Sequence, residues 1–143
     1  DALDRIHIGG FADGIVRMLI FLARSRKQVR RDRLERANQM MTVTEPFAGM
    51  PAKQLTRMIH RASLIVSFAP EEAMATLPAL IRTPAARKEA LAICETIAGP
   101  REEMNPETQD MFNRLKSALE DTRFGDRRKK RSSKPTKSKG KRG

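Results

Sequence analysis

The apolar positions along this chain recur every three to four residues, which is the spacing of one face of an α-helix. No segment alternates apolar and polar residues with the β-branched and aromatic side chains that a strand needs. The pattern therefore predicts an all-α fold. Residues 12–24 carry apolar side chains on nearly every side, so we expect this helix in the centre of a bundle. Its apolar positions are Ile15, Val16, Met18, Leu19, Ile20, Phe21 and Leu22.

Two amphipathic helices are predicted next, roughly over residues 31–41 and 52–68. The segment TEPFAG between them supplies the break. The buried face of the first helix is predicted to consist of Leu34, Ala37, Met40 and Met41. The buried face of the second is predicted to consist of Leu55, Met58, Ile59, Ala62, Ile65 and Val66.

Proline, glycine and short polar residues mark the remaining helices. Pro70 suits the first turn of a fourth helix, where Glu71 and Glu72 favour the positive end of the helix dipole. Pro78 ends or kinks that helix early. The prediction is therefore a short fourth helix.

The last two helices have clear start signals. Thr83 is the expected N-cap of a helix that starts at Pro84 and closes at Gly99, and Asn105 is the expected N-cap of one that starts at Pro106. The predicted buried positions are Ala90, Leu91, Cys94, Ile97 and Ala98 in the first, and Met111, Phe112, Leu115, Ala118 and Leu119 in the second. The prediction is a compact bundle of about six helices.

The net charge of +12 is concentrated in two segments. Residues 123–143 carry eleven Lys or Arg and one acid, whereas residues 1–122 are nearly neutral at +2. Within that body, residues 24–36 contribute +5 and the rest contributes −3. We expect an all-α domain over residues 1–122 and a disordered Lys/Arg-rich tail over residues 123–143, because the tail has too few apolar residues to fold alone.

The length of 143 residues fits one domain with a modest core. A single cysteine excludes an internal disulfide framework and suits a reducing compartment, so we expect a cytoplasmic protein. The longest apolar run, residues 18–23, is too short for a membrane span. Because the chain starts at Asp1 rather than Met, we expect it to be a piece of a longer protein.

A pattern of apolar helix, polar loop and amphipathic helix occurs twice, in IFLARSRKQVRRDRLERANQMM and in AICETIAGPREEMNPETQDMFNRL, with Val29 and Met104 as apolar anchors of the two loops. This arrangement resembles the tellurite-resistance TerB-like helical fold. The segments FADGIVRMLIFLARSRKQVRRDRLERANQMM and EEAMATLPALIRTPAARKEALAICETIAGPREEMNPETQDMFNRLKSAL are similar to the C-terminal region of bacterial polyhydroxyalkanoate-synthase-related proteins. The similarity covers about residues 11–119.

In that family the helical region follows an α/β-hydrolase-like domain. The resemblance therefore implies an accessory domain of a larger protein, with any catalytic nucleophile elsewhere in the polypeptide. This chain contains no G-x-S-x-G or G-x-C-x-G elbow motif. We predict that it is not an enzyme and requires no cofactor.

The TerB-like resemblance also implies acidic loop residues that bind a metal. The first loop of this chain, RSRKQVRRD, is basic, and only Asp32 and Glu35 remain acidic there. The second loop keeps a dense acidic group, which forms the candidate metal ligands: Glu102, Glu103, Glu107 and Asp110. The alternative is that Glu107 simply interacts with the helix dipole. We predict no metal site, with a metal-responsive module as an alternative hypothesis.

Other candidates for chemistry have structural interpretations. Cys94 falls on the buried face of its helix and is expected to be a core residue rather than a nucleophile. Neither His7 nor His60 has a spacing that predicts contact with it, and His60 is expected on the surface. Gly9 and Gly10 are expected to form a hinge into the first helix rather than an anion site.

The cationic side chains are the candidate polyanion-binding residues. In the body they are Arg24, Arg26, Lys27, Arg30, Arg33, Lys53, Arg57 and Arg61. In the tail they are Arg127, Arg128, Lys129, Lys130, Arg131, Lys134, Lys137, Lys139, Lys141 and Arg142. The body cations form one positive face only if residues 31–41 and 52–68 pack as neighbouring helices. Solvated surface is the alternative for the body, and a solubilising role is the alternative for the tail.

With no Trp or Tyr to stack on bases, any binding of nucleic acid is expected to rely on phosphates, to ignore sequence and to weaken with salt. The leading hypothesis is a non-catalytic interaction domain. Its partner would be another protein or a preceding domain of the same polypeptide, and its tail would contact nucleic acid or an acidic protein. A stand-alone, non-specific nucleic-acid-binding protein is a further alternative.

Overall fold

The computed structural model describes residues 10–26 and 31–120, except for the side chains of Arg31, Arg33 and Leu34. Within this part of the chain all regular structure is helical, so the predicted all-α class is confirmed. The elements are α1 (Phe11–Arg24), α2 (Arg31–Val43), α3 (Ala52–Phe68), α4 (Pro70–Ala75), α5 (Leu77–Leu80), α6 (Pro84–Ala98), the 3₁₀ turn η1 (Arg101–Glu103) and α7 (Pro106–Glu120).

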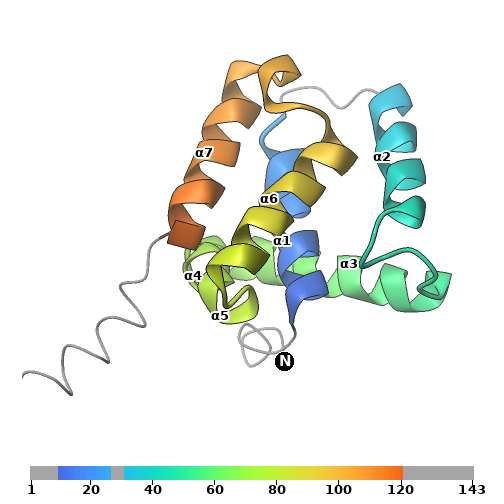
Figure 1. Cartoon of the computed structure of the whole chain (residues 1–143), viewed down its shortest axis with the longest axis horizontal. Coiled ribbons are helices and arrows are strands. Elements are labelled where there is room, and N and C mark those ends of the chain that lie inside the picture. The colour runs from blue at the N-terminus through green and yellow to red at the C-terminus, as the bar shows by residue number, and fades with distance from the viewer. Residues whose placement is uncertain (1–9, 27–30, 121–143) are drawn as a thin grey trace, which may run out of the picture.

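Helices α1 and α6 lie against each other in the middle of the bundle (Figure 1). The helix that follows each of them packs on the other one: α2 lies on α6, and α7 lies on α1. The Ser25 hydroxyl at the end of α1 donates to Thr108 Oγ1 in the first turn of α7, at 3.1 Å. The two similar sequence segments are therefore packed reciprocally around a shared α1–α6 core.

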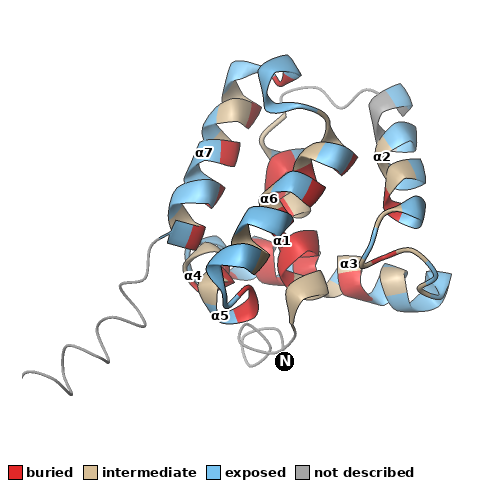
Figure 2. Cartoon of the chain, viewed as in Figure 1, coloured by how far each residue is buried: buried red, intermediate tan, exposed pale blue. Residues whose placement is uncertain are grey.

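Helix α1 has the central position that its apolar sequence predicts. It packs on α3, α5, α6 and α7, and its residues Ile15 and Met18 are fully buried (Figure 2). On α6, Ala90 and Cys94 are fully buried as well. Every side of α1 must meet another element because nearly every side of it is apolar.

The predicted helix starts after residue 82 are confirmed by their capping bonds. Thr83 Oγ1 accepts the N–H of Ala86 at 3.0 Å, and Asn105 Oδ1 accepts the N–H of Thr108 at 2.8 Å. Gly99 ends α6 with φ = 106°, a backbone conformation that L-residues with a side chain rarely adopt. These short-range interactions define α6 and α7 at the residues expected.

The segment after Pro70 forms two short helices rather than one. Glu71 and Glu72 occupy the first turn of α4, which ends at Ala75, and Pro78 lies in the first turn of α5. Proline is tolerated there because the N–H groups of a first turn have no partner within the helix. This break gives seven α-helices in the described part of the chain, where about six were predicted.

Most predicted buried positions lie in the core. On α3, Met58, Ala62, Ile65 and Val66 are buried, while on α7 the buried members are Phe112, Leu115 and Leu119. The other predicted positions on these two helices, Leu55, Ile59, Met111 and Ala118, are half-buried. On α2, Met41 is buried, and Ala37 and Met40 pack half-buried against the same core. The anchor Met104 is buried as expected, whereas Val29 lies outside the described residues.

Candidate functional site

A buried arginine joins α1 to the short helix α4. Arg17 is only 2% exposed, and its Nη1 donates at 2.9 Å both to the backbone oxygen of Ala73 and to Thr76 Oγ1. The Thr76 hydroxyl in turn donates to the backbone oxygen of Glu72 at 2.6 Å. The guanidinium therefore interacts with the last turn of α4, where backbone oxygens lack donors within the helix.

Burial lowers the pKa of Arg17 to about 10, because desolvation disfavours the charged form, while Asp13 opposes the shift. The side chain is still protonated at neutral pH, so a cation is held inside the bundle. Arg17 was not among the residues predicted to be functional. The signal in the sequence was a cation in the middle of a helix whose neighbouring positions are apolar.

The N-terminus of α1 binds a carboxylate from its own helix. The N–H of Gly10 donates to Asp13 Oδ2 at 3.2 Å, and Asp13 Oδ1 forms an ion pair with Arg61 of α3 at 3.2 Å. Gly10 is therefore the N-cap of α1, and its N–H is satisfied by the Asp13 carboxylate rather than by an external anion. Gly9 lies outside the described residues.

Several candidate polyanion-binding arginines have partners within the chain. Arg24 at the end of α1 donates to Ser67 Oγ of α3, and Arg26 Nη2 donates to the backbone oxygen of Ala98 at 3.3 Å. Arg61 is the partner of Asp13. These three side chains therefore help to join helices.

Lys53 and Arg57 are exposed on α3, and neither has a hydrogen-bond or ion-pair partner among the described residues. A merged positive face requires α2 and α3 to pack side by side, but α2 packs on α6 while α3 packs on α1. Lys27, Arg30, the side chain of Arg33 and all the tail candidates lie outside the described residues. The structure therefore places two unpartnered body cations together, on α3.

The acidic candidates do not form a metal site in the described ranges, where no group of three or more His, Cys, Asp or Glu residues lies close enough to hold a metal ion. Glu102 and Glu103 are exposed on η1, and Asp110 is exposed on α7. Glu107 is in the first turn of α7, as the dipole interpretation expects. Closeness in sequence does not bring these carboxylates together, because they belong to two differently oriented elements.

The single thiol is enclosed by the core, as predicted. Cys94 is fully buried on α6, and burial, with a smaller effect of Glu95, raises its pKa to about 12. The nucleophilic form of cysteine is the thiolate. His60 is exposed on α3, also as predicted, and His7 lies outside the described residues.

We expect Cys94 to resist alkylation in the native protein at pH 8 and to react rapidly in denaturant. Its raised pKa also predicts a stability contribution that is complete below about pH 9 and is lost as the pH rises towards 12, because the unfolded chain releases the thiol proton first. Iodoacetamide labelling followed by mass spectrometry measures the protection. Rapid native labelling would contradict the core assignment.

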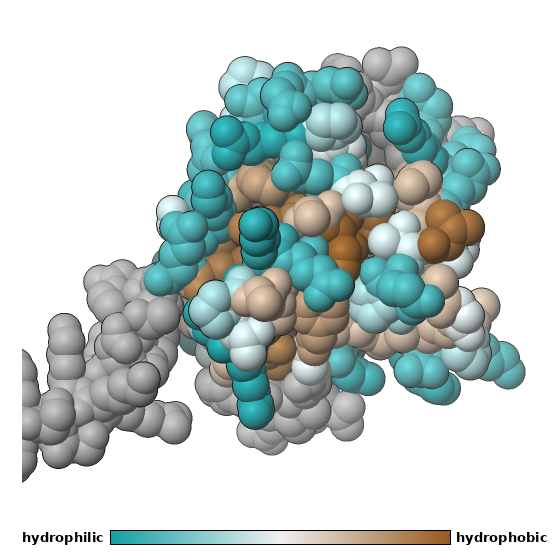
Figure 3. Space-filling view, viewed as in Figure 1, coloured by the Kyte–Doolittle hydropathy of each residue, from teal (hydrophilic) through white to brown (hydrophobic). Residues whose placement is uncertain are grey.

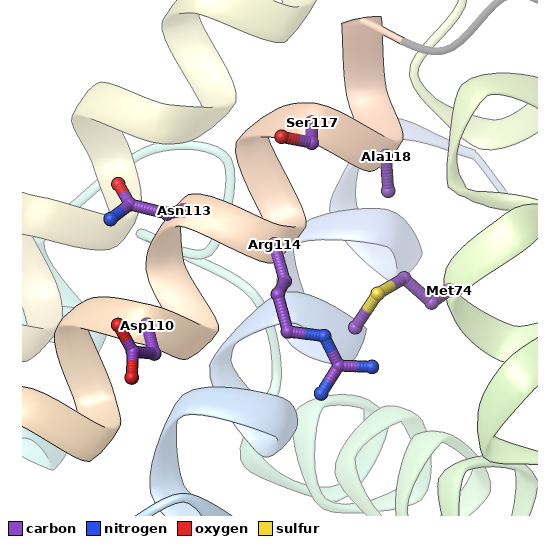
Figure 4. Close-up of a pocket in the computed structure, with 6 residues that line it drawn as sticks. All are labelled: Met74, Asp110, Asn113, Arg114, Ser117 and Ala118. Atoms are coloured by element: carbon purple, nitrogen blue, oxygen red, sulfur yellow. The ribbon is translucent and has the colours of Figure 1, made fainter.

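An open groove of about 650 Å³ runs between α4 and α7 (Figure 4). In it Arg114 extends from α7 towards Met74 of α4, with Asp110 and Ser117 on neighbouring turns of α7. The groove contains neither a histidine nor a cysteine. Its polar lining consists of Asp110, Asn113, Arg114 and Ser117, and no hydrogen bond joins the Ser117 hydroxyl to the Asp110 carboxylate.

Hydrophilic side chains cover most of the described surface on the face shown in Figure 3, and apolar surface shows in a band between α6 and α2. Among the residues that the structure describes, no helix combines the length and the apolar character needed to cross a membrane. Comparisons of the chain with protein-family models, with curated proteins and with solved structures found no match.

Proposed function

We propose that this chain is a non-catalytic helical domain that acts by binding, and that residues 123–143 contact polyanions, nucleic acid above all, without reading their sequence. The observation that carries the proposal is the charge distribution. The last 21 residues hold +10 of the total +12, while the first 122 residues are nearly neutral. Lys and Arg at this density attract phosphates through counterion release, independently of base sequence.

The chemistry of the helical body supports a binding role rather than catalysis. Its only thiol is buried and protonated at neutral pH, and neither a histidine nor a cysteine lines the groove between α4 and α7. Arg17, the buried cation, donates hydrogen bonds to the backbone oxygen of Ala73 and to Thr76 Oγ1, which gives it a structural role. The body is therefore suited to hold the basic segment and to contact another protein surface.

The resemblance to the C-terminal region of polyhydroxyalkanoate-synthase-related proteins supports a more specific proposal. In this proposal the body is a TerB-like accessory domain that contacts a preceding hydrolase-like domain or a separate protein. The reciprocal packing of α1–α2 with α6–α7 is consistent with the two related halves on which the resemblance rests. A bacterial, cytoplasmic setting belongs to the same proposal.

Deleting residues 123–143 tests the polyanion proposal. We expect the deletion to abolish binding to double-stranded DNA at low salt and to leave the helical circular-dichroism signal unchanged. If about six of the cations contact phosphates, the affinity of the intact chain should fall roughly 10³-fold between 50 and 200 mM salt. Gel-shift titrations over a salt series measure both effects.

A matched variant, Lys53→Gln combined with Arg57→Gln, removes the two exposed α3 cations while keeping the tail. The quantity compared is the slope of log affinity against log salt concentration. We expect this slope to change by less than the amount that one phosphate contact contributes, because the tail carries most of the charge. Equal DNA retention by the intact and the truncated chains would overturn the role of the tail.

A further inference from the structure

The outer side of α3 carries exposed side chains at every third or fourth position. We call these five residues the α3 stripe: Lys53, Arg57, His60, Leu64 and Phe68. At 100° per residue they fall on one face of the helix. The opposite face carries Ala62, Ile65 and Val66, which are buried where α3 packs on α1. The α3 stripe is therefore the side of α3 that points away from the bundle.

The C-terminal part of the α3 stripe is apolar. Leu64 is 39% exposed, and Phe68, one turn later, is 70% exposed. In the described ranges the only other large apolar side chain that is exposed is Val43, at the end of α2. Two apolar side chains that are adjacent on an exposed helix face mark a surface that gains free energy when a partner removes it from water.

Every charged side chain on α3 is a cation. Lys53 and Arg57 are exposed on the α3 stripe, and neither has a partner among the described residues. Arg24 of α1 adds a cation at the other end of the stripe, because it donates to the hydroxyl of Ser67, the residue before Phe68. Cations therefore lie towards both ends of the apolar pair.

The α3 stripe itself contains no acid. The acids closest to it in sequence are Glu45, which lies in the loop before α3, and Glu71 and Glu72, which belong to α4. Helix α4 is a separate element, because α3 ends before Ala69. An anionic surface laid along the stripe therefore meets cationic, imidazole and apolar side chains, which is the charge complementarity that such a contact requires.

We propose that the α3 stripe is a contact surface for an anionic lipid bilayer. In this contact Leu64 and Phe68 enter the boundary between headgroups and acyl chains, while Lys53, Arg57 and Arg24 reach the lipid phosphates. Lys and Arg side chains are long enough to keep their charge at the phosphates while their apolar neighbours go deeper. The contact is peripheral, and it goes beyond the proposed function because the tail takes no part in it.

The combination of cations with an apolar pair favours a bilayer over other anionic partners. A nucleic-acid duplex offers phosphates to Lys53 and Arg57 but has no apolar layer that would cover Leu64 and Phe68. The outer face of a single helix is convex, so a rigid protein partner would need a matching hollow, whereas a fluid lipid surface adapts to it. An anionic bilayer supplies phosphates and an apolar layer at adjacent depths.

A tryptophan at position 68 distinguishes insertion of the α3 stripe from attachment by the tail. The basic tail can hold the chain on anionic vesicles, but only contact through the stripe moves residue 68 out of water. The chain has no Trp or Tyr, so Phe68→Trp provides a single fluorescent reporter in the full chain. Ala92→Trp, at an exposed position of α6, is the matched control.

We expect the emission of Phe68→Trp to move to shorter wavelength with vesicles of phosphatidylglycerol mixed with phosphatidylcholine. Lipids brominated in their acyl chains should quench it, and Ala92→Trp should show neither effect. Adding Lys53→Gln and Arg57→Gln to the Phe68→Trp chain should raise the lipid concentration that gives half of the shift, by roughly fivefold for each cation removed.

The same lysine and arginine substitutions should leave DNA binding by the tail nearly unchanged, and deletion of the tail should abolish that binding. The two proposals can therefore fail independently. Circular dichroism verifies that each variant is folded. If Phe68→Trp loses the helical signal, Leu64→Trp provides a second reporter on the α3 stripe, with the same expected shift.

Equal responses of Phe68→Trp and Ala92→Trp to the mixed vesicles would overturn the proposal. So would an equally large shift with vesicles of phosphatidylcholine alone, because the cations would then have no role. A response of Phe68→Trp to double-stranded DNA but not to vesicles would make the α3 stripe a nucleic-acid contact instead.

Discussion

Arg17→Ala is expected to lower the free energy of unfolding by about 3 kcal/mol or more, the largest effect of any single charged residue in the helical body. The reason is the site that the side chain leaves behind. The backbone oxygen of Ala73 and Thr76 Oγ1 would lose a charged donor in a position where Arg17 itself is only 2% exposed. The truncation also leaves a cavity in the contact between α1 and α4.

Arg17→Met separates these two contributions. Methionine fills much of the volume and removes the desolvation cost that lowers the pKa of the arginine, but it cannot donate a hydrogen bond. We expect its free energy of unfolding to lie between those of the native chain and Arg17→Ala. A methionine variant as unstable as the alanine variant would show that the hydrogen bonds outweigh the packing.

Urea denaturation followed by circular dichroism measures both variants. Arg61→Ala is the matched control, because it also removes an arginine that joins two helices. Its ion pair with Asp13 is about one-third exposed, so its loss should cost less than about 1 kcal/mol. If the free energy of unfolding of Arg17→Ala were equal to or higher than that of Arg61→Ala, the buried contact would have no special role.

Gly14→Val is expected to destabilise the bundle by about 2 kcal/mol or more. A Cβ atom at Gly14 would lie 2.8 Å from Ile81 Cγ1 and 3.3 Å from Leu80 Cβ, both closer than ordinary carbon contacts. Ile81 is fully buried and Leu80 is nearly so, so neither can move without displacing its neighbours. The absence of a side chain at Gly14 is what lets α5 approach α1.

Thermal unfolding of Gly14→Val and Gly14→Ala measures this close approach. Alanine should cost less than valine, because it adds one carbon only and gains about 1 kcal/mol of helix propensity over glycine. Ala92→Val introduces the same β-branched side chain at an exposed position of α6 and should change stability by less than about 1 kcal/mol. A Gly14→Val variant with the thermal stability of this control would refute the steric argument.

The helix boundaries could be predicted because their causes are local. Thr83 and Asn105 accept N–H groups three residues ahead, and Gly99 ends α6 with a positive φ. Each interaction spans less than two helical turns, so the residues that make it are visible together in the sequence. The burial of Cys94 and the exposure of His60 follow from helical phasing in the same way.

The local sequence pattern could not predict which charged side chains lie together on the surface, because that depends on how the helices pack. The cations of α2 and α3 were predicted to form one positive face only if those two helices are neighbours. In the structure α2 packs on α6 instead. The partners of Arg24 and Arg61 lie 43 and 48 residues away in the chain. No spacing rule connects residues at such separations, since their contact is set by how whole helices cross.

By itself, the sequence determined the all-α class, the starts of α6 and α7, the buried thiol and the concentration of positive charge in residues 123–143. Tertiary structure alone decided that Arg17 is buried, that α5 approaches α1 at Gly14, and that Leu64 and Phe68 remain uncovered. The physical reason is range. Capping and amphipathic phasing act within a few residues, whereas burial depends on which other helix covers a face.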